Sequence, residues 1–183
     1  MRIVIAATGA SGAIYLQRLI DAIAADGPHE MHLVASGYGQ QVIHEELGEL
    51  RVPDSLIQHS DRSMNAPFAS GSALFDAMLI VPCSMGTLGR IAAGTSDSLI
   101  LRAADVFLKE SRPLILVPRE TPWNLIHARN VVRVMEAGAR VLPAMPSFYS
   151  KPGTIEELVD TVVWRILDQI GIRSPNACRW RES

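Results

Sequence analysis

Short apolar runs alternate along the chain with segments whose apolar residues recur at helical spacing. Runs of strand length cover residues 3–7, 31–35, 77–81 and 113–117, and a shorter one covers 139–142. Helical spacing covers residues 12–25, 40–50, 99–110 and 123–137, follows the loop at 82–87, and resumes after a capping threonine, Thr154. This alternation predicts an α/β protein, with a three-layer, Rossmann-like open parallel sheet and helices on both faces.

The chain is long enough to form one domain with its own core, and we predict a single domain over residues 1–183. It contains no internal repeat, low-complexity tract or boundary between domains. Residues 51–72 are the least regular part, and we interpret them as a lid or binding loop. A polar C-terminal tail is predicted from about residue 173.

Small, hydroxyl and charged residues follow four of the predicted strands. In chain order they are Thr8-Gly9-Ala10-Ser11-Gly12, Ser36, Ser84-Met85-Gly86-Thr87 and Arg119-Glu120. Because the carboxyl ends of parallel strands share one edge of a sheet, these loops predict a ligand site there. The first loop leads into a helix, whose free amides and dipole favour an anion or a cofactor phosphate. The alternative is that the serines only cap helices.

Composition and charge narrow the function classes. Hydrophobic residues at 48%, charged residues at 20% and a net charge of −2 are typical of a soluble globular domain, with no nucleic acid or membrane partner indicated. Two distant cysteines favour a reducing compartment, and we expect a cytoplasmic protein. His44-Glu45 is not followed by a second histidine at Gly48, and no other set has metal-ligand spacing, so no metal is predicted.

Several motifs in order along the chain resemble those of the flavin prenyltransferase (UbiX-type) family. They are Thr-Gly-Ala-Ser-Gly at 8–12, Pro-Cys-Ser-Met-x-Thr at 82–87, Arg-Ala-Ala-Asp-Val-x-Leu-Lys-Glu at 102–110 and Pro-Arg-Glu-Thr-Pro at 118–122, with Phe148-Tyr149 and Arg179-Trp180 as further matches. The resemblance implies transfer of a dimethylallyl group from dimethylallyl phosphate to N5 and C6 of reduced FMN. It also implies that the product, prenylated FMN, serves a partner decarboxylase of the UbiD type.

The resemblance assigns roles to residues of this chain. FMN contacts fall on Gly9, Ala10, Ser11, Ser36, Ser84, Met85, Gly86, Thr87, Arg119 and Trp180, with the FMN phosphate expected near the first turn. Contacts with the allylic phosphate fall on Arg102, Lys109, Tyr149 and Arg165. Fixed cations and a phenol stabilise charge on a leaving phosphate, so we expect transfer without a metal.

Two acidic residues also match the family's active site, Glu46 and Glu120. A partly desolvated carboxylate can take the proton that leaves the flavin, and we expect Glu120 to be the acid/base. The alternative for Glu46 is surface charge beside Glu45 and Glu49. For Arg102 and Lys109, the alternative interpretation is that they belong to a solvated helix face. For Arg165, the alternative is that it is a polar position of an amphipathic helix.

The chain departs from the family at three positions. Gly37 stands where many relatives carry Lys, Ser98 stands where an Asn is common, and Met64 stands where relatives can place a Trp near the allyl group. A thioether stabilises an allyl cation less than an aromatic face does. We expect these departures to affect the handling of the prenyl donor more than the binding of FMN.

Three other functions compete with prenyl transfer. A flavoprotein that decarboxylates a peptidyl cysteine needs a Pro-Ala-Ser-Ala-Asn-Thr loop, whereas residues 82–87 read Pro-Cys-Ser-Met-Gly-Thr. A non-catalytic FMN-binding subunit or carrier of a decarboxylase system is the second alternative. An NAD(P) oxidoreductase is disfavoured because the first turn lacks a third glycine and the second strand has no acidic end.

A large aromatic residue lies in the polar tail, where Trp180 stands between Arg179 and Arg181. Such a side chain is normally buried against something. The resemblance implies a flavin site built from more than one subunit, so we expect a closed homo-oligomer, a dodecamer, with Trp180 near a neighbouring subunit's flavin. The alternative is that Trp180 covers the core of its own domain.

Overall fold

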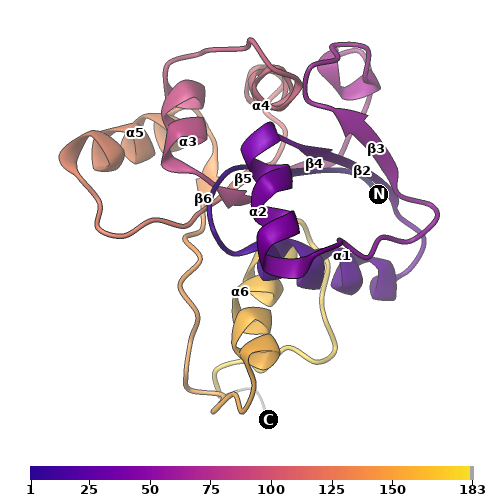
Figure 1. The fold of residues 1–183 in the computed structure, drawn as a ribbon, viewed down its shortest axis with the longest axis vertical. Coiled ribbons are helices and arrows are strands. Elements are labelled where there is room, and N and C mark those ends of the chain that lie inside the picture. The colour runs from indigo at the N-terminus through magenta and orange to yellow at the C-terminus, as the bar shows by residue number, and fades with distance from the viewer. Residues whose placement is uncertain (182–183) are drawn as a thin grey trace.

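Six parallel strands form one sheet in the order β3-β2-β1-β4-β5-β6 (Figure 1). The strands are β1 (Arg2–Ala7), β2 (Glu30–Ala35), β3 (Ile57–Ser60), β4 (Ala77–Cys83), β5 (Leu114–Pro118) and β6 (Arg140–Val141). The structure is a computed structural model that describes residues 1–181, so residues 182–183 of the predicted domain lie outside the described residues. The chain moves outward from β1 in both directions, which makes the β1–β4 boundary the switch point where ligands of such sheets bind.

The helices are α1 (Ala13–Asp26), α2 (Gly37–Leu47), α3 (Met85–Ala92), α4 (Leu99–Lys109), α5 (Leu125–Glu136) and α6 (Ile155–Gln169), with a short 3₁₀ turn, η1 (Pro67–Ala69). Helices α1 and α6 cover one face of the sheet, and α3, α4 and α5 cover the other (Figure 1). The predicted three-layer fold with helices on both faces is confirmed.

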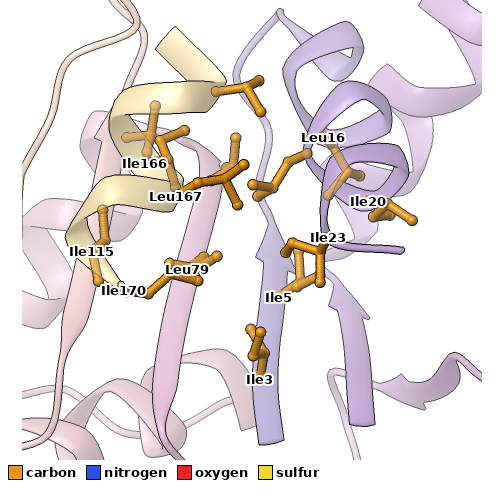
Figure 2. Packing of buried hydrophobic residues seen from close by; sticks show 14 of the residues in the cluster. Ile3, Ile5, Leu16, Ile20, Ile23, Leu79, Ile115, Ile166, Leu167 and Ile170 are labelled. Atoms are coloured by element: carbon orange, nitrogen blue, oxygen red, sulfur yellow. The ribbon is translucent and has the colours of Figure 1, made fainter. Parts of the chain in front are cut away.

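Two apolar cores form because successive strand residues point to opposite faces. On β1, Ile3 and Ile5 pack against α1 and α6, and Val4 packs on the other side with α3 and α4. Figure 2 shows the first core, where Leu16, Ile20 and Ile23 of α1 lie beside Ile166, Leu167 and Ile170 on the same face of the sheet. Each fully buried side chain of this size stabilises the fold by about 1.5–3 kcal/mol. The buried strands hold the loops at their ends in fixed positions.

Regular structure interrupts the segment that we predicted to be irregular. Strand β3 lies within residues 51–72 and pairs with β2 at the edge of the sheet. It has no apolar run because an edge strand is largely exposed, as Ile57 and Gln58 are. The prediction of a loop without regular structure over 51–72 was therefore wrong for residues 57–60.

Helix α2 begins at Gly37 rather than at Gln40. Ser36 caps it, since the Ser36 hydroxyl accepts a hydrogen bond from the Gly39 amide at 3.0 Å. Gly39 lies so close to the end of β1 that an added Cβ would stand 2.5 Å from the Ala7 carbonyl oxygen. This close approach brings α2 onto the loop after β1.

Candidate functional site

Hydrogen bonds join the loops after β1, β4 and β5 into one surface. The Thr8 hydroxyl donates to the Pro82 carbonyl at 3.1 Å and accepts from the Ser84 amide at 2.8 Å. Nε of Arg119 donates to the Ser11 carbonyl at 2.8 Å, and the Arg119 amide donates to the carbonyl of Cys83. The loop after β2 joins them through the Ser36 amide, which bonds the Ala7 carbonyl. The strand ends thus meet as the sequence predicted.

Two of the predicted FMN-contacting serines cap helices in this structure. Ser36 caps α2, and the Ser84 hydroxyl caps α3 by accepting from the Thr87 amide at 3.2 Å while it donates to the Thr87 hydroxyl at 3.1 Å. Capping does not exclude ligand contact, because the first amides of each helix have no partner inside the helix. Gly37 has open space around the position of a Cβ, and Met85 and Gly86 open α3 at the same edge.

Glu46 reaches from α2 to the N-terminus of α1. Its carboxylate accepts from the Gly12 amide at 2.9 Å and from the Ala13 amide at 2.7 Å. Burial alone would raise the pKa of Glu46, but hydrogen bonds from Ser11, Gly12 and Ala13, together with the positive charge of Arg119, outweigh it and lower the pKa. Glu46 is therefore ionised at neutral pH and is a weaker base than an ordinary carboxylate, unlike the desolvated base that the sequence suggested.

The same contacts change where a phosphate can bind. The expected cradle at the first turn is taken by Glu46, because its carboxylate occupies the amides of Gly12 and Ala13. The N-termini of α2 and α3 remain as amide donors at this edge, beside Ser36 and Ser84. Gly9, Ala10 and Ser11 lie between these helix ends and present backbone rather than bulky side chains.

Glu120 lies at the end of β5 and is exposed in the single chain. Its carboxylate accepts a hydrogen bond from the adjacent Thr121 amide at 3.0 Å, and its backbone carbonyl accepts one from the indole of Trp123. The partial desolvation that we expected of this carboxylate is absent from the described chain. Any desolvation must come from a bound ligand or from another subunit.

Arg102 lies against the end of η1, and Lys109 lies against the segment that follows it. Nε of Arg102 donates to the Ala69 carbonyl at 3.0 Å, and Nη1 donates to Asp105 at 2.8 Å. Lys109 pairs with Glu110, and its Nζ lies 2.8 Å from the position of a Cβ on Gly71. The two cations lie on one side of α4, as their spacing predicted, and are tied to neighbours rather than only solvated.

Tyr149, Arg165 and Trp180 meet in a second cluster formed by residues 143–153, α6 and the tail. The Tyr149 hydroxyl donates to the Cys178 carbonyl at 3.3 Å, and its ring packs edge-on against Trp180 with centroids 5.4 Å apart. Together with Asp168 and Arg179 they line a cavity of about 250 Å³. Trp180 is 66% exposed, so the alternative that it covers the core of its own domain was wrong.

The fold separates the four residues assigned to the allylic phosphate. Arg102 and Lys109 lie on α4, which covers one face of the sheet, and Arg165 lies on α6, which covers the other. Tyr149 lies beside α6, across the cavity that both residues line. One chain therefore does not bring the four residues together.

The three departures from the family pattern have clear places in the fold. Ser98 caps α4, since its hydroxyl accepts from the Leu101 amide at 3.4 Å, so it replaces an Asn with another capping residue. Met64 is exposed between β3 and η1. The sequence placed Thr8 in the first loop of the site but gave it no individual role, and the structure shows that its hydroxyl joins the loops after β1 and β4.

Residues 1–181 contain neither a cluster suited to a metal ion nor a helix suited to span a membrane. No group of three or more His, Cys, Asp or Glu side chains in this part of the chain is arranged to hold a metal ion. Within the same range, every helix is too short or too polar to cross a membrane. Cys83 is buried, and burial raises the pKa of its thiol to about 12, so it is not a nucleophile at neutral pH.

The residues at the strand ends fit a flavin mononucleotide. Amides at two helix N-termini and the hydroxyls of Ser36, Ser84 and Thr87 suit a phosphate and a ribityl chain. Arg119 uses only Nε toward Ser11, which leaves its two terminal nitrogens without a hydrogen-bond partner among residues 1–181. A guanidinium in this position suits an anionic oxygen or a flavin carbonyl.

Solved structures similar to this one bind flavin. A dodecameric FMN-dependent UbiX-like decarboxylase from Escherichia coli O157:H7 is 39% identical, with a TM-score of 0.94 over 99% of this chain and 100% of that chain. A UbiX protein in complex with FMN and dimethylallyl pyrophosphate is 42% identical, with a TM-score of 0.92 over 100% and 98%. The cysteine decarboxylase TvaF is 20% identical with a TM-score of 0.65, which shows a shared fold only.

Relatives found by sequence are similar to this protein over almost its full chain. The flavin prenyltransferase UbiX of Halalkalibacterium halodurans is 44% identical over 96% of this chain and 91% of its own, and that of Thermoplasma acidophilum is 45% identical over 98% and 100%. The model of the Flavoprotein family matches residues 1–167. The chain therefore belongs to the Flavoprotein family and, within it, to the flavin prenyltransferases of the UbiX type.

Proposed function

We propose that this protein is a flavin prenyltransferase that joins the dimethylallyl group of dimethylallyl phosphate to N5 and C6 of reduced FMN. The carbon–oxygen bond of the donor breaks, inorganic phosphate leaves, and N5 bonds the freed carbon and loses its proton. The ring then closes as the donor's double bond takes up a proton and C6 bonds its other carbon and loses a proton. The observation that carries the proposal is the bonded edge of strand-end loops, where Arg119 contacts Ser11, in a chain 44% identical to a flavin prenyltransferase. Reduced FMN is here a substrate, and no metal is required.

FMN lies across the strand-end loops in this proposal. Backbone of Gly9, Ala10 and Ser11 lines one side, and the first turns of α2 and α3 bind the phosphate end. The support is chemical, since these turns present amides and hydroxyls and Arg119 presents a cation at the same edge.

The leaving phosphate is bound by cations from two subunits. Arg102 and Lys109 come from α4 of one chain, and Tyr149 and Arg165 come from a neighbour, because one chain holds these pairs on opposite faces of its sheet. Fixed positive charge stabilises the negative charge that builds on the phosphate oxygens as the bond breaks. Trp180 of the neighbour's tail covers the flavin.

The oligomer that completes this site is a dodecamer, the state of the relative from Escherichia coli O157:H7. Large apolar side chains exposed on the single chain support an assembly. They occur on α5 and around residues 145–155, and they are Leu125, Ile126, Val132, Met135, Met145, Phe148 and Ile155. Against the part of the chain that the structure describes, helix α5 buries Val134 alone, so its outer face is suited to a contact between subunits.

The two glutamates have different tasks in this proposal. Glu46 stays ionised and holds Ser11 and the start of α1 in place, as its hydrogen bonds support. Glu120 takes the proton from the flavin, because among residues 1–181 its carboxylate is held by the adjacent Thr121 amide alone and lies beside Arg119 at the strand-end edge. The closing of the site by ligand and neighbour supplies the desolvation that a general base requires.

A decarboxylase of the UbiD type is the proposed recipient of prenylated FMN, and a cytoplasmic location stays a prediction from the cysteine content. Incubation of the purified protein with reduced FMN and dimethylallyl phosphate tests the proposal directly. Prenylated FMN is the expected product. A protein that binds FMN but leaves it unmodified would instead be a non-catalytic carrier.

A further inference from the structure

Asp168 accepts hydrogen bonds from two arginines that belong to different segments of the chain. Arg179 of the tail donates from Nη2 to Oδ1 at 2.8 Å and from Nη1 to Oδ2 at 3.2 Å. Arg165, one helical turn before Asp168 on α6, donates to Oδ2 at 3.4 Å. One carboxylate thus contacts both a residue assigned to the allylic phosphate and the segment that carries Trp180.

The two contacts differ in strength. The bidentate pair with Arg179 is the stronger geometry, and both side chains are partly buried, at 32% and 18% exposure. The longer single contact leaves Arg165 63% exposed, so most of its guanidinium faces outward from α6. Asp168 therefore fixes the tail firmly and limits the positions of Arg165 without consuming its hydrogen-bonding capacity.

Further contacts extend this cluster to Tyr149. Its hydroxyl bonds the Cys178 carbonyl, next to Arg179, and its ring contacts Trp180. The segment around Tyr149, the tail and α6 enclose the cavity of about 250 Å³ described above. The tail supplies both contacts of Tyr149, the Cys178 carbonyl and the Trp180 ring. Loss of the pair between Arg179 and Asp168 would loosen the tail, so this carboxylate helps to set the geometry of the cavity.

We propose that Asp168 is a positioning residue of prenyl transfer: it anchors the tail through Arg179 and orients Arg165 toward the phosphate of the allylic donor. The inference rests on the proposed function, which assigns Arg165, Tyr149 and Trp180 to the active site. Asp168 does not contact the reacting atoms itself. Its negative charge also offsets the repulsion between two adjacent guanidinium groups when no phosphate is bound.

Asp160 on the same helix supplies a matched control. It forms a bidentate pair with Arg18 of α1, at side-chain exposures of 15% and 34%, close to those of the pair formed by Asp168 and Arg179. Asp168→Asn and Asp160→Asn therefore each remove one equivalent charge pair from α6, but only the first touches the cavity lined by Arg165. Each substitution is made separately in the full-length oligomer.

The test compares the two variants with the parent in steady-state prenyl transfer. Asp168→Asn is expected to raise KM for dimethylallyl phosphate roughly fivefold, as for loss of a partly exposed pair, with kcat and the Kd for FMN within about twofold of the parent. Asp160→Asn is expected to keep the parent KM. A parent-like KM in Asp168→Asn, or an equal rise in Asp160→Asn, overturns the inference.

Hydrogen exchange of the amides of residues 174–181 gives a readout that does not need activity. Exchange is expected to be about tenfold faster in Asp168→Asn than in the parent or in Asp160→Asn, because the tail has lost its anchor. If no protein, the parent included, makes prenylated flavin, the proposed function fails, and exchange alone decides whether Asp168 anchors the tail. Equal exchange in all three proteins overturns that anchoring.

Discussion

Arg119 and Ser11 lie 108 positions apart in the sequence, and the guanidinium Nε of one donates to the backbone carbonyl of the other at 2.8 Å. This bond ties the loop after β5 to the loop after β1 across the intervening end of β4. It fixes Arg119 at the edge where FMN is proposed to bind and leaves its two terminal nitrogens without a hydrogen-bond partner among residues 1–181. The site is therefore organised by contacts between loops as well as by the sheet.

Replacement of Arg119 by Ala should weaken FMN binding by about 2 kcal/mol, or roughly 30-fold, because a charge-assisted contact is lost. Arg119→Lys keeps the charge but loses the forked geometry, so its Kd should fall between those of the parent and Arg119→Ala. Titration calorimetry with FMN measures all three. If Arg119→Ala binds FMN as tightly as the parent, Arg119 does not contact the flavin.

Glu46→Gln should lower the free energy of unfolding at pH 7 by about 0.5–1 kcal/mol, the range for an exposed charge at a helix terminus. The folded state lowers the pKa of Glu46 below its ordinary value of 4.5, so the carboxylate stabilises the fold above pH 4.5. That stabilisation is lost as the pH falls through the folded pKa, and the difference between parent and variant should shrink with it.

Denaturant unfolding between pH 3 and pH 7 measures this effect, with parent and variant compared at the same protein concentration because the stability of an oligomer depends on it. Glu45→Gln is the matched control, since within residues 1–181 Glu45 accepts from Gln41 of its own helix alone, and its replacement should change stability little. Equal effects of the two substitutions at every pH would show that the bond from Glu46 to α1 contributes nothing.

Glu120→Gln should bind FMN normally and slow turnover by roughly 100-fold or more if its carboxylate takes the proton from the flavin. The amide keeps the shape and an oxygen for the contact with the Thr121 amide, so the change removes the basicity and the negative charge of the carboxylate and little else. Single-turnover rates compare it with Glu136→Gln, an exposed glutamate on α5. An unchanged rate in Glu120→Gln would remove this residue from the mechanism.

Truncation after Ser174 should leave a folded protein that binds FMN but no longer transfers the prenyl group. It removes Trp180 and the partners of Tyr149 and Asp168, all of which lie outside the two cores. Circular dichroism reports the fold, and flavin mass spectrometry reports transfer. Transfer at the parent rate, or a full-length protein that is active as a monomer, would contradict a site shared between subunits.

The arrangement of the strand ends could be predicted because it depends on short-range patterns. Apolar runs identify central strands, and parallel pairing then places Ser11, Ser36, Ser84 and Arg119 at one edge. Strand β3 escaped prediction because an edge strand needs no continuous apolar run. Its sequence resembles a loop, and only pairing with β2 orders it.

Contacts between charged side chains that are distant in the chain could not be predicted from the sequence. Glu46 has the same local surroundings as Glu45, yet only Glu46 points from α2 to the amides of α1. Asp168 reads as an ordinary polar position of an amphipathic helix until the tail folds back and places Arg179 against it. Such pairings depend on packing angles between elements, which hydrophobic periodicity does not specify.

The mass of the flavin after reaction tests the central claim most directly. The purified protein is incubated without oxygen with reduced FMN and dimethylallyl phosphate, with and without a metal chelator, and the released flavin is analysed by mass spectrometry. We predict a flavin heavier by one five-carbon unit in both reactions, and none when the donor is omitted. FMN that is bound but unchanged in mass, or a product that disappears with the chelator, would contradict metal-independent prenyl transfer.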